Sequence, residues 1–477
     1  MWKEAGKAVS LSNLFAKQAL GRKARHTFIG FENRKKCDKM SEVLASGATL
    51  KTETGATVVV DRLLGEGGQG RVYKVKYNGR PKALKMYIPE KVKNLKWFHE
   101  NLTEEIHNGR PSDKFIWPED LTEWQNGTFG YIMDLRPADY MEFGDLLLAK
   151  QEMSSFTAMI NCALRMISAF RVLHSKGMCY QDLNDGNFFL RAKDGDVLVC
   201  DNDNASPLDN PSGIAGKARY MAPSVVMGGK PNYNTDRFSL ATCLFLLLVR
   251  THPLEGIRTL TVPEMNDYYL QLCYGKDPIF IADPTDRSNA PSKDIDGVRN
   301  FFIRWPLLTK KLQEMFIQTF SKEAMLHNEK KFSMERDWQR ALLQYRAHFV
   351  KCPVCGRETL YRGEPICSCC HKKYPIYGYF KFSNFGAYKV PIIKNGGIFQ
   401  EYIDDFAVAN VQFKPERISV VRVNSAKKLV ALENLSTSKW RYSFPDGTSG
   451  TVSSGEFIPL KDQTKIKIGD EEITVTM

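Results

Sequence analysis

The residues that most constrain this chain lie between Gly65 and Val72. They read Gly-Glu-Gly-Gly-Gln-Gly-Arg-Val, a G-x-G-x-x-G-x-V pattern between two strand-like segments. Glycine has no Cβ, so Gly65, Gly67 and Gly70 let backbone N–H groups lie close over phosphate oxygens. In a dinucleotide-binding fold such glycines open a helix, whereas here Val72 continues into a strand-like run. The segment therefore indicates a phosphate-binding hairpin, with a plain hairpin turn as the alternative.

Three further polar motifs follow in a fixed order. Lys85 ends a Lys-Ala-Leu-Lys run fifteen residues after Gly70. Asp182 and Asn187 lie five residues apart, and Asp201 follows an apolar run fourteen residues later. Each of these carboxylates and amides, taken alone, is typical of a helix cap or a turn. Together they predict phosphoryl transfer, which needs a positioner for the attacking hydroxyl and hard oxygen ligands for a metal ion.

On these motifs, residues 57–345 resemble a protein kinase of the Ser/Thr type. The resemblance implies that Asp182 orients the substrate hydroxyl and that Asn187 and Asp201 hold Mg²⁺ or Mn²⁺. Lys85 would pair with the phosphates of ATP, clamped by a glutamate for which Glu104 is best spaced and Glu100, one turn earlier on the same helical face, is the alternative. Asp236 resembles the buried aspartate that anchors the catalytic loop. The implied nucleotide-binding residues are Gly65, Gly67, Gly70, Val72, Ala83, Lys85, Met133 and Leu135.

Several residues depart from the pattern of that family. Gln181 replaces the arginine that normally neutralises an activation-loop phosphate, so control by such phosphorylation is not expected. Asn184 stands where the family usually has a lysine that reaches the γ-phosphate, so one cation is missing from the transition-state clamp. Asn202 and Asp203 replace the usual Phe-Gly pair. We interpret Asp203 as a hydrogen-bonded turn residue in preference to a further metal ligand.

A buried ion pair of the family is also altered. Ser224 replaces its glutamate, and the stretch Lys330–Ser333 lacks its arginine, which is consistent because losing one partner alone would strand a charge. The metal-binding and phosphate-binding groups are retained, so an active kinase is favoured over a pseudokinase. With the segments Phe115–Pro118 and His252–Gly256, these variants resemble a divergent bacterial kinase group.

Five of the eleven cysteines lie within residues 352–370. Four of them have the spacing C-x₂-C-x₁₁-C-x₂-C: Cys352, Cys355, Cys367 and Cys370. Two such knuckles supply the four thiolates of a closed, structural Zn²⁺ site. Cys369 and His371 are alternative ligands, but the two-residue gap favours Cys370. The other cysteines are scattered singly, which indicates a reducing compartment without disulfides.

The last hundred residues return to short alternating runs, with turn signals at Asn395-Gly396 and Asp446-Gly447. The order of Asn434-Leu435-Ser436, Trp440 and the later strand-like runs distantly resembles forkhead-associated β-sandwiches, which bind phosphothreonine. The Ser-x-x-His element of that family is not evident. The segment therefore predicts a β-sandwich for protein interaction or for packing on the kinase, and phosphopeptide binding is not expected.

The net charge of +13 hints at nucleic acid, but +7 of it falls within residues 1–39, and Met40 offers an alternative start. This basic arm leaves nucleic acid only weakly supported as a partner. The longest uncharged apolar run, residues 242–249, is too short to span a bilayer, and no apolar signal segment follows the basic residues. These features predict a soluble, cytoplasmic chain.

The 477 residues, 43% of them hydrophobic and 25% charged, are enough for several domains. We expect a multidomain α+β chain with a bilobal kinase fold. Its predicted parts are a basic flexible arm (1–50), a kinase N-lobe (51–137), a C-lobe (138–350), a zinc ribbon (351–377) and a β-sandwich (378–477). Strand-like runs at 57–60, 71–77 and 82–87 precede helical patterns at 161–176, 235–250, 306–320 and 334–350. The predicted function is ATP-dependent phosphorylation of protein Ser/Thr hydroxyls in signalling or stress defence. A nucleotide-binding pseudokinase scaffold and a nucleic-acid-responsive regulator are the alternatives.

Overall fold

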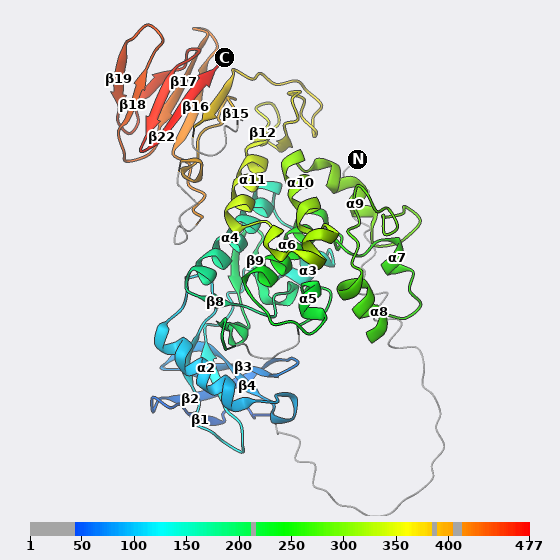
Figure 1. The fold of residues 1–477 in the computed structure, drawn as a ribbon. Coiled ribbons are helices and arrows are strands. Elements are labelled where there is room, and N and C mark those ends of the chain that lie inside the picture. Colours follow the sequence, from blue (N-terminus) through cyan, green and yellow to red (C-terminus); the bar gives the residue numbers. More distant parts are fainter. Residues whose placement is uncertain (1–42, 211–215, 384–388, 404–412) are drawn as a thin grey trace, which may run out of the picture.

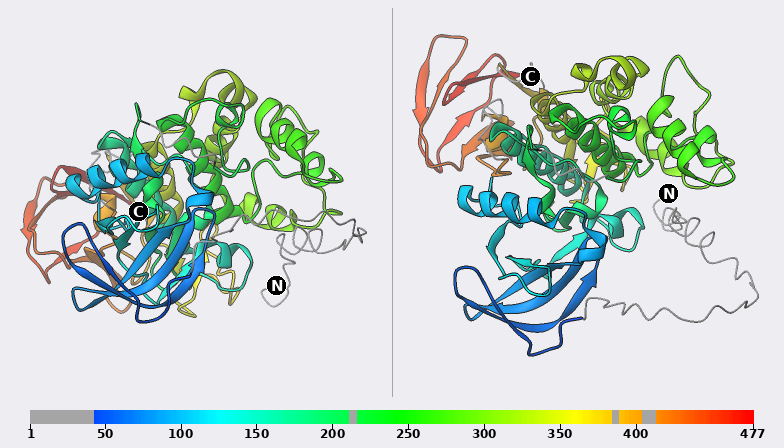
Figure 2. Two further views of the ribbon diagram at one scale, coloured as in Figure 1. Left: turned by 90° about the horizontal axis from the view of Figure 1, so that it is seen from below. Right: turned by 60° about the horizontal axis from the view of Figure 1, so that its bottom comes forward.

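A computed structural model of the chain describes residues 43–210, 216–383, 389–403 and 413–477. A small sheet-rich lobe lies against a larger helical lobe, and the C-terminal strands lie at the end of the helical lobe away from the small one (Figures 1 and 2). Most of the predicted arm, residues 1–42, falls outside the described residues. Residues 49–51 of the chain are a strand, so the sheet of the small lobe begins inside the range assigned to the arm.

The N-lobe is a six-stranded antiparallel sheet with the order β1-β2-β3-β4-β6-β5. A tight turn at Asn78 and Gly79, which both have positive φ, joins β3 to β4. Helix α2 (Leu95–Asn108) follows, and its N-terminus is capped by the Asn94 side chain, which accepts a hydrogen bond from Trp97 N. The strands are β1 (Thr49–Lys51), β2 (Thr57–Glu66), β3 (Gly70–Tyr77), β4 (Arg80–Tyr87), β5 (Pro118–Leu121) and β6 (Gly130–Met133).

The C-lobe is built around two helices, α4 and α6, whose residues are buried almost throughout. By length and composition α4 is apolar enough to cross a membrane, but 89% of its most apolar window is buried inside the protein, as in a core helix. The helices are α3 (Phe143–Leu147), α4 (Phe156–Ser175), α5 (Pro223–Val226), α6 (Tyr233–Val249), α7 (Ile257–Leu260), α8 (Asp267–Gln271), α9 (Arg299–Arg304), α10 (Lys310–Thr319) and α11 (Glu335–Ala347).

Short strands before α3 and between α4 and α5 position the loops that face the N-lobe. Strands β7 (Tyr140–Glu142), β9 (Phe188–Arg191) and β10 (Asp196–Val199) form one sheet, and β8 (Met178–Cys179) pairs with β11 (Ser206–Pro207). The β9–β10 turn contains Gly195, where an added Cβ would lie 1.9 Å from the Ala158 carbonyl oxygen of α4. Only glycine therefore allows this turn to pack so closely on the central helix.

Beyond α11 the chain forms a short hairpin and then two antiparallel sheets. The hairpin is β12 (Phe349–Lys351) with β13 (Glu358–Leu360), and its turn carries the first cysteine pair. The six-stranded sheet has the order β15-β14-β22-β21-β18-β19 and the other has the order β16-β17-β20. Buried side chains of both sheets share one hydrophobic core, which agrees with the predicted all-β architecture.

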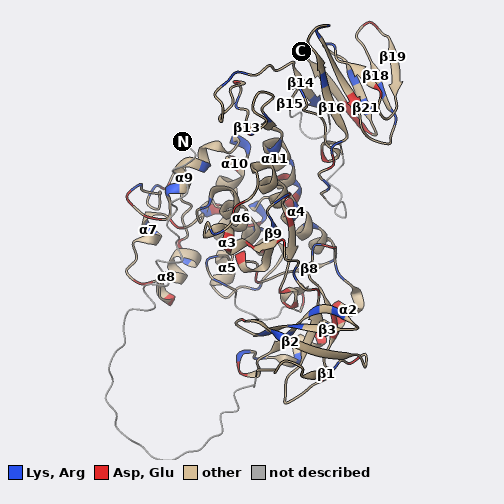
Figure 3. Ribbon diagram, turned by 180° about the vertical axis from the view of Figure 1, so that it is seen from behind, with Lys and Arg blue, Asp and Glu red and all other residues tan. Residues whose placement is uncertain are grey.

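The strands of these two sheets are β14 (Tyr379–Phe382), β15 (Lys389–Pro391), β16 (Ser419–Asn424), β17 (Leu429–Asn434), β18 (Trp440–Ser443), β19 (Ser449–Val452), β20 (Phe457–Pro459), β21 (Lys465–Ile468) and β22 (Glu471–Thr476). Lys and Arg are interspersed with Asp and Glu over both lobes and the C-terminal strands (Figure 3).

Candidate active site

The glycine-rich segment is the hairpin between β2 and β3. Gly67 N donates to the Gly70 carbonyl across the turn, at 2.8 Å. A Cβ on Gly70 would lie 2.3 Å from the Met86 carbonyl oxygen, so this position requires glycine for the close approach of β4. The predicted phosphate-binding glycines therefore form a strand-to-strand turn, in agreement with the sequence, and not the start of a helix.

The residues predicted around the base lie on neighbouring strands. Ala83 of β4 and Met133 of β6 are partners in the ladder between these two strands. The partly buried Val72 and Leu135 side chains belong to the same apolar cluster. These four residues, far apart in sequence, are thus brought together at the junction of the lobes.

Lys85 lies at the centre of the site and is almost fully buried. Its Nζ is 2.8 Å from Asp203 Oδ2, 3.0 Å from Asp203 Oδ1 and 3.5 Å from Asp201 Oδ1. Burial alone would lower the pKa of Lys85, but the charges of Asp203 and Asp201 outweigh it and raise this pKa. Lys85 therefore stays protonated.

Asp203 has a larger role than the sequence suggested. Its side chain is fully buried and accepts hydrogen bonds from Lys85 and, at 2.6 Å, from the Tyr87 hydroxyl. The interpretation as a simple turn residue missed this contact, because β4 and the Asp201–Asp203 segment are separated by more than a hundred residues. Gln69 was also missed: its Oε1 accepts from Lys85 Nζ at 3.1 Å.

The glutamate of helix α2 that faces this site is Glu105. Glu104, the predicted residue, is exposed, and the alternative Glu100 is exposed and pairs with Lys96 on the helix surface. Glu105 is buried, and burial together with the charge of Asp203 raises its pKa well above the usual range. One residue turns a helix by 100°, so an error of one position moves a side chain from the buried face to the surface. The exposed position of Glu104 does not fit the predicted clamp, and the buried glutamate of this helix is Glu105, whose Oε1 accepts a hydrogen bond from Asn101 Nδ2 at 2.8 Å.

The catalytic loop follows β8, and its first residues are hydrogen-bonded to Asp236 of α6. The Asp236 carboxylate accepts hydrogen bonds from Tyr180 N at 2.6 Å and from Gln181 N at 3.1 Å. Gln181 has a φ of 73°, a left-handed conformation that a non-glycine residue adopts only when its surroundings impose it. Asp236 thus anchors the loop, as the sequence predicted.

Asp182 lies at the rim of this loop. Asn184 Nδ2 donates to its carbonyl oxygen at 3.1 Å and to its Oδ1 at 3.2 Å. Burial raises the pKa of Asp182 to about 6, against the opposing charge of Lys217. A carboxylate that titrates near neutral pH suits a group that accepts a proton from a hydroxyl.

The two predicted metal ligands, Asn187 and Asp201, lie on neighbouring segments: Asn187 ends the catalytic loop, and Asp201 follows β10. Asn187 Oδ1 accepts from Asn184 N at 2.8 Å, and the Asn187 carbonyl accepts from Cys200 N at 2.9 Å, which ties the two segments together. Asp201 has left-handed backbone angles, and its side chain is 46% exposed. Its carboxylate is therefore open to a ligand, next to Lys85.

The residues that depart from the family pattern make hydrogen bonds of their own. Gln181 donates through Nε2 to Ser206 on β11, so it joins the catalytic loop to the segment after Asp201. Ser224 donates to Glu329. The segment before Ser224 is held by Arg219, which forms two hydrogen bonds of 2.8 and 2.9 Å with the buried Glu255.

The four predicted zinc ligands form a second cluster, at the hairpin after α11. The Sγ atoms of Cys352, Cys355, Cys367 and Cys370 all lie within 4.8 Å of one another. The alternative ligand Cys369 points elsewhere, with its Sγ 3.9 Å from the Glu358 carbonyl oxygen. Four thiols at this separation suit a tetrahedral metal site.

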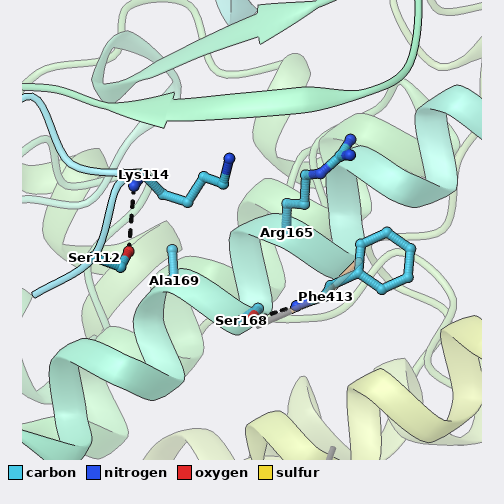
Figure 4. Close-up of a pocket in the computed structure, with 6 residues that line it drawn as sticks. All are labelled: Ser112, Lys114, Arg165, Ser168, Ala169 and Phe413. Atoms are coloured by element: carbon cyan, nitrogen blue, oxygen red, sulfur yellow. Dashed lines mark hydrogen bonds between the residues drawn. The ribbon is translucent and has the colours of Figure 1, made fainter. Parts of the chain in front are cut away.

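A small pocket lies away from both clusters, where Phe413 reaches α4 (Figure 4). Phe413 N donates to Ser168 Oγ at 3.3 Å, and the Arg165 guanidinium lies 5.6 Å from the Phe413 ring centre. The lining residues are Ser112, Lys114, Arg165, Ser168, Ala169 and Phe413, none of which belongs to the predicted site. The pocket marks where the C-terminal region packs on the C-lobe.

Comparisons with known proteins agree with this geometry. A family model described as the protein kinase domain matches residues 58–274. The chain is 22% identical over 244 residues to a probable LIM domain-containing serine/threonine-protein kinase of Dictyostelium discoideum, a match covering 47% of this chain and 35% of that protein. It is 26% identical over 203 residues to a probable serine/threonine-protein kinase of Zea mays, covering 41% and 32%. The matched region thus spans about a third of these relatives.

Among solved structures, the kinase domain of Mycobacterium tuberculosis PknI is similar, with 19% identity, a TM-score of 0.42 and coverage of 64% of this chain and 100% of that one. The sequence match carries the assignment, because its bounds enclose the glycine-rich hairpin, Lys85, the catalytic loop and Asp201. Residues 58–274 of this chain form a protein kinase domain of the kind found in serine/threonine kinases.

Proposed function

We propose that this protein is an ATP-dependent protein kinase that phosphorylates Ser/Thr hydroxyls of other proteins in signalling or stress defence. The observation that carries the proposal is the convergence of Lys85, Asp182 and Asp201 on the junction of the lobes, next to Asn187 and the glycine-rich hairpin. A pseudokinase has no need to keep all of these groups together.

In the proposed reaction Asp182 orients the acceptor hydroxyl and takes its proton, while Lys85 binds nucleotide phosphates. A kinase domain implies ATP and Mg²⁺, and the residues present fit both. Asn187 and Asp201 would hold the metal, which supplies charge neutralisation at the phosphates. The two carboxylates around Lys85, the buried Asp203 and the partly exposed Asp201, outnumber its single positive charge, which favours binding of a cation.

A phosphotransfer assay tests the proposal. Purified full-length protein is mixed with labelled ATP, Mg²⁺ and a generic protein acceptor, beside the variants Asp182→Ala and Asp201→Ala. We expect labelling by the wild type and a loss of at least about a hundredfold in either variant. The exposed Glu104→Ala variant is the matched control and should label as the wild type does. Equal labelling by all four proteins would rule out the enzyme.

The same preparation separates the alternatives. A pseudokinase scaffold would bind a nucleotide without transferring phosphate. A nucleic-acid-responsive regulator would bind DNA or RNA with a steep salt dependence that disappears on deletion of residues 1–39.

We propose that the four cysteines hold a structural Zn²⁺ that fixes the hairpin to the kinase. The hairpin residue Glu358 accepts hydrogen bonds from Phe156 N at 2.7 Å and Thr157 N at 3.0 Å, at the start of α4. About one zinc per chain is expected, lost in Cys352→Ser with a fall in the melting temperature, while Cys369→Ser keeps the metal. Retention of zinc by Cys352→Ser would contradict the assignment.

The remaining proposals concern context. A bacterial origin rests on the resemblance of the Tyr-Gln-Asp-Leu and Cys-Asp-Asn-Asp-Asn segments to a divergent bacterial group. A cytoplasmic location rests on the scattered thiols, and a protein partner is proposed for the C-terminal strands. Their likeness to forkhead-associated domains stays a prediction.

A further inference from the structure

The catalytic loop contains no positive charge of its own. Between Asp182 and Asn187 it carries two carboxylates, Asp182 and Asp185, and the neutral Asn184. The Asn184 amide donates to the Asp182 carboxylate, so it orients this group. It cannot supply the positive charge that a transferred phosphoryl group requires as negative charge spreads over its oxygens.

A cation reaches the loop from the segment before α5. Lys217 Nζ donates to Asn184 Oδ1 at 2.8 Å and lies 3.6 Å from Asp185 Oδ1. The preceding residue brings the segment close, because a Cβ on Gly216 would lie 2.8 Å from Asp182 Oδ1. The Gly216–Lys217 segment therefore lies against Asp182, the proton-accepting carboxylate, and the Lys217 ammonium group contacts Asn184 and Asp185 of the same loop.

The Lys217 side chain is also accessible. It is 57% exposed although it makes these two contacts, so a ligand at the loop can reach its Nζ. An ammonium group has three donors, of which Asn184 takes one and Asp185 is in range of a second. At least one donor is left to face a phosphate oxygen.

We propose that Lys217 is a catalytic residue that supplies the cation missing at position 184 and contacts the transferred γ-phosphoryl group. The inference rests on the proposed kinase function. In that reaction the acceptor hydroxyl oxygen forms a bond to the γ-phosphorus, and the bond from this phosphorus to the β–γ bridging oxygen breaks. The hydroxyl proton passes to Asp182 and ADP leaves. Lys217 stays protonated throughout and stabilises the charge on the equatorial oxygens.

A structural tether between the two segments is the competing explanation. A tether needs the hydrogen bond to Asn184 and would be expected to affect folding and substrate binding. A catalytic cation affects the chemical step and works from either of two neighbouring positions. Exchanging the two residues therefore separates the explanations, because it keeps the composition and moves only the charge.

The experiment compares four full-length proteins: wild type, Lys217→Met, Lys217→Arg and the exchange variant Asn184→Lys/Lys217→Asn. Steady-state phosphorylation gives kcat and the KM for ATP. The melting temperature with Mg²⁺ and a non-hydrolysable ATP analogue reports folding and nucleotide binding. We expect Lys217→Met to lower kcat about a hundredfold with less than a threefold change in KM and an unchanged melting temperature. Lys217→Arg should keep kcat within about tenfold, and the exchange variant should recover at least about tenfold over Lys217→Met.

Three results overturn the inference alone while the wild type is active. The first is a kcat for Lys217→Met within threefold of the wild type. The second is an exchange variant as slow as Lys217→Met, and the third is a loss in Lys217→Met that appears in the melting temperature and KM. The last two point to a tether. A wild type no more active than Asp182→Ala overturns the proposed function, and this inference with it.

Discussion

The two lobes contain two charge clusters that are balanced differently. The anchor cluster consists of His174, Asp236, Arg237 and Glu335 on α4, α6 and α11. Its two carboxylates face two cations, with His174 Nε2 3.1 Å from Asp236, His174 Nδ1 2.7 Å from Glu335, and Arg237 2.9 Å from Glu335. The nucleotide cluster consists of Lys85, Glu105, Asp201 and Asp203. There a single cation, Lys85, pairs with two carboxylates, and the carboxyl group of Glu105 is influenced by the charge of Asp203.

The pKa values of the buried groups reflect the different charge balance of the two clusters. Burial would lower the pKa of His174, but hydrogen bonds to Asp236 and Glu335 outweigh it and raise this pKa to about 9. Burial would likewise raise the pKa of Glu335, but His174 and Arg237 lower it to about 2. In the nucleotide cluster the pKa of Glu105 is raised instead, and its Oε2 has no hydrogen-bond partner among the described residues. A balanced cluster holds the fold, and an unbalanced one keeps a place for a cationic ligand.

Breaking the anchor should have the largest effect on stability. Asp236→Ala removes the acceptor of Tyr180 N and Gln181 N and leaves buried His174 with one partner fewer. We expect the free energy of unfolding, measured with urea, to fall by about 3–5 kcal/mol. Asp61→Ala, which breaks the exposed pair with Lys74, is the control and should change little. A change in Asp236→Ala no larger than in the control would show that the anchor is not structural.

The anchor should also be sensitive to high pH. A histidine whose folded pKa exceeds its unfolded value stabilises the fold fully below about 6.5, and the contribution is lost as the pH rises through about 9. The stability difference between the wild type and His174→Gln should therefore be about 3 kcal/mol larger at pH 6 than at pH 10. The groups that face His174 are Asp236, Glu335 and the Tyr233 ring. The exposed His327→Gln variant should show no such change, and a pH-independent difference for His174→Gln would contradict the raised pKa.

Catalytic activity should depend on pH between pH 5 and pH 7, a range in which the anchor cluster does not change its protonation. The pKa of Asp182 is raised to about 6, so its proton-accepting form is lost as the pH falls. We expect kcat/KM for phosphotransfer to fall about tenfold between pH 7 and pH 5. The melting temperature should not fall over this range, because His174 stays protonated and Glu335 ionised. A flat activity profile would contradict the role of Asp182.

Replacing Glu105 in the nucleotide cluster should have the smallest effect on stability. It should stabilise the fold, whereas substitutions in the anchor cluster destabilise it. Because the pKa of Glu105 is raised in the fold, the wild type must take up a proton on folding, and stability falls as the pH rises above about 4.5. Glu105→Gln should therefore be more stable than the wild type by about 1 kcal/mol or more at pH 8, with little difference at pH 4. Glu104→Gln, on the exposed face, should leave stability unchanged. Destabilisation by Glu105→Gln at pH 8 would show that the carboxylate is ionised and paired.

The sequence was sufficient for those parts of the site that depend on local chemistry. A turn that must approach another strand needs glycine, so Gly70 was identifiable, and Lys85, Asp182 and Asp201 follow at characteristic spacings. The predicted runs at 57–60, 71–77 and 82–87 lie within β2, β3 and β4, because β-branched runs bounded by Gly-rich or Asn-Gly turns favour strands through local chemistry. Their chemical roles stay predictions until the assays are done.

What the sequence could not give is which distant residues share one buried volume. Glu105 is buried and Glu104 is exposed because the packing of α2 sets the rotation of the helix, which residue spacing alone does not determine. Asp203 and Lys217 lie in short polar segments that look like ordinary turns or surface.

The amino-acid sequence by itself therefore determined the kinase architecture and the spacing of the four clustered cysteines, and it predicted most of the proposed site residues. Only the tertiary structure decided the pairing of Lys85 with Asp203, the burial of Glu105 and the placement of Lys217 beside Asn184. The physical reason is that electrostatic partners are chosen by distance in space, across 118 residues for Lys85 and Asp203 and 33 for Lys217 and Asn184, whereas turns and periodic burial are chosen by neighbours along the chain.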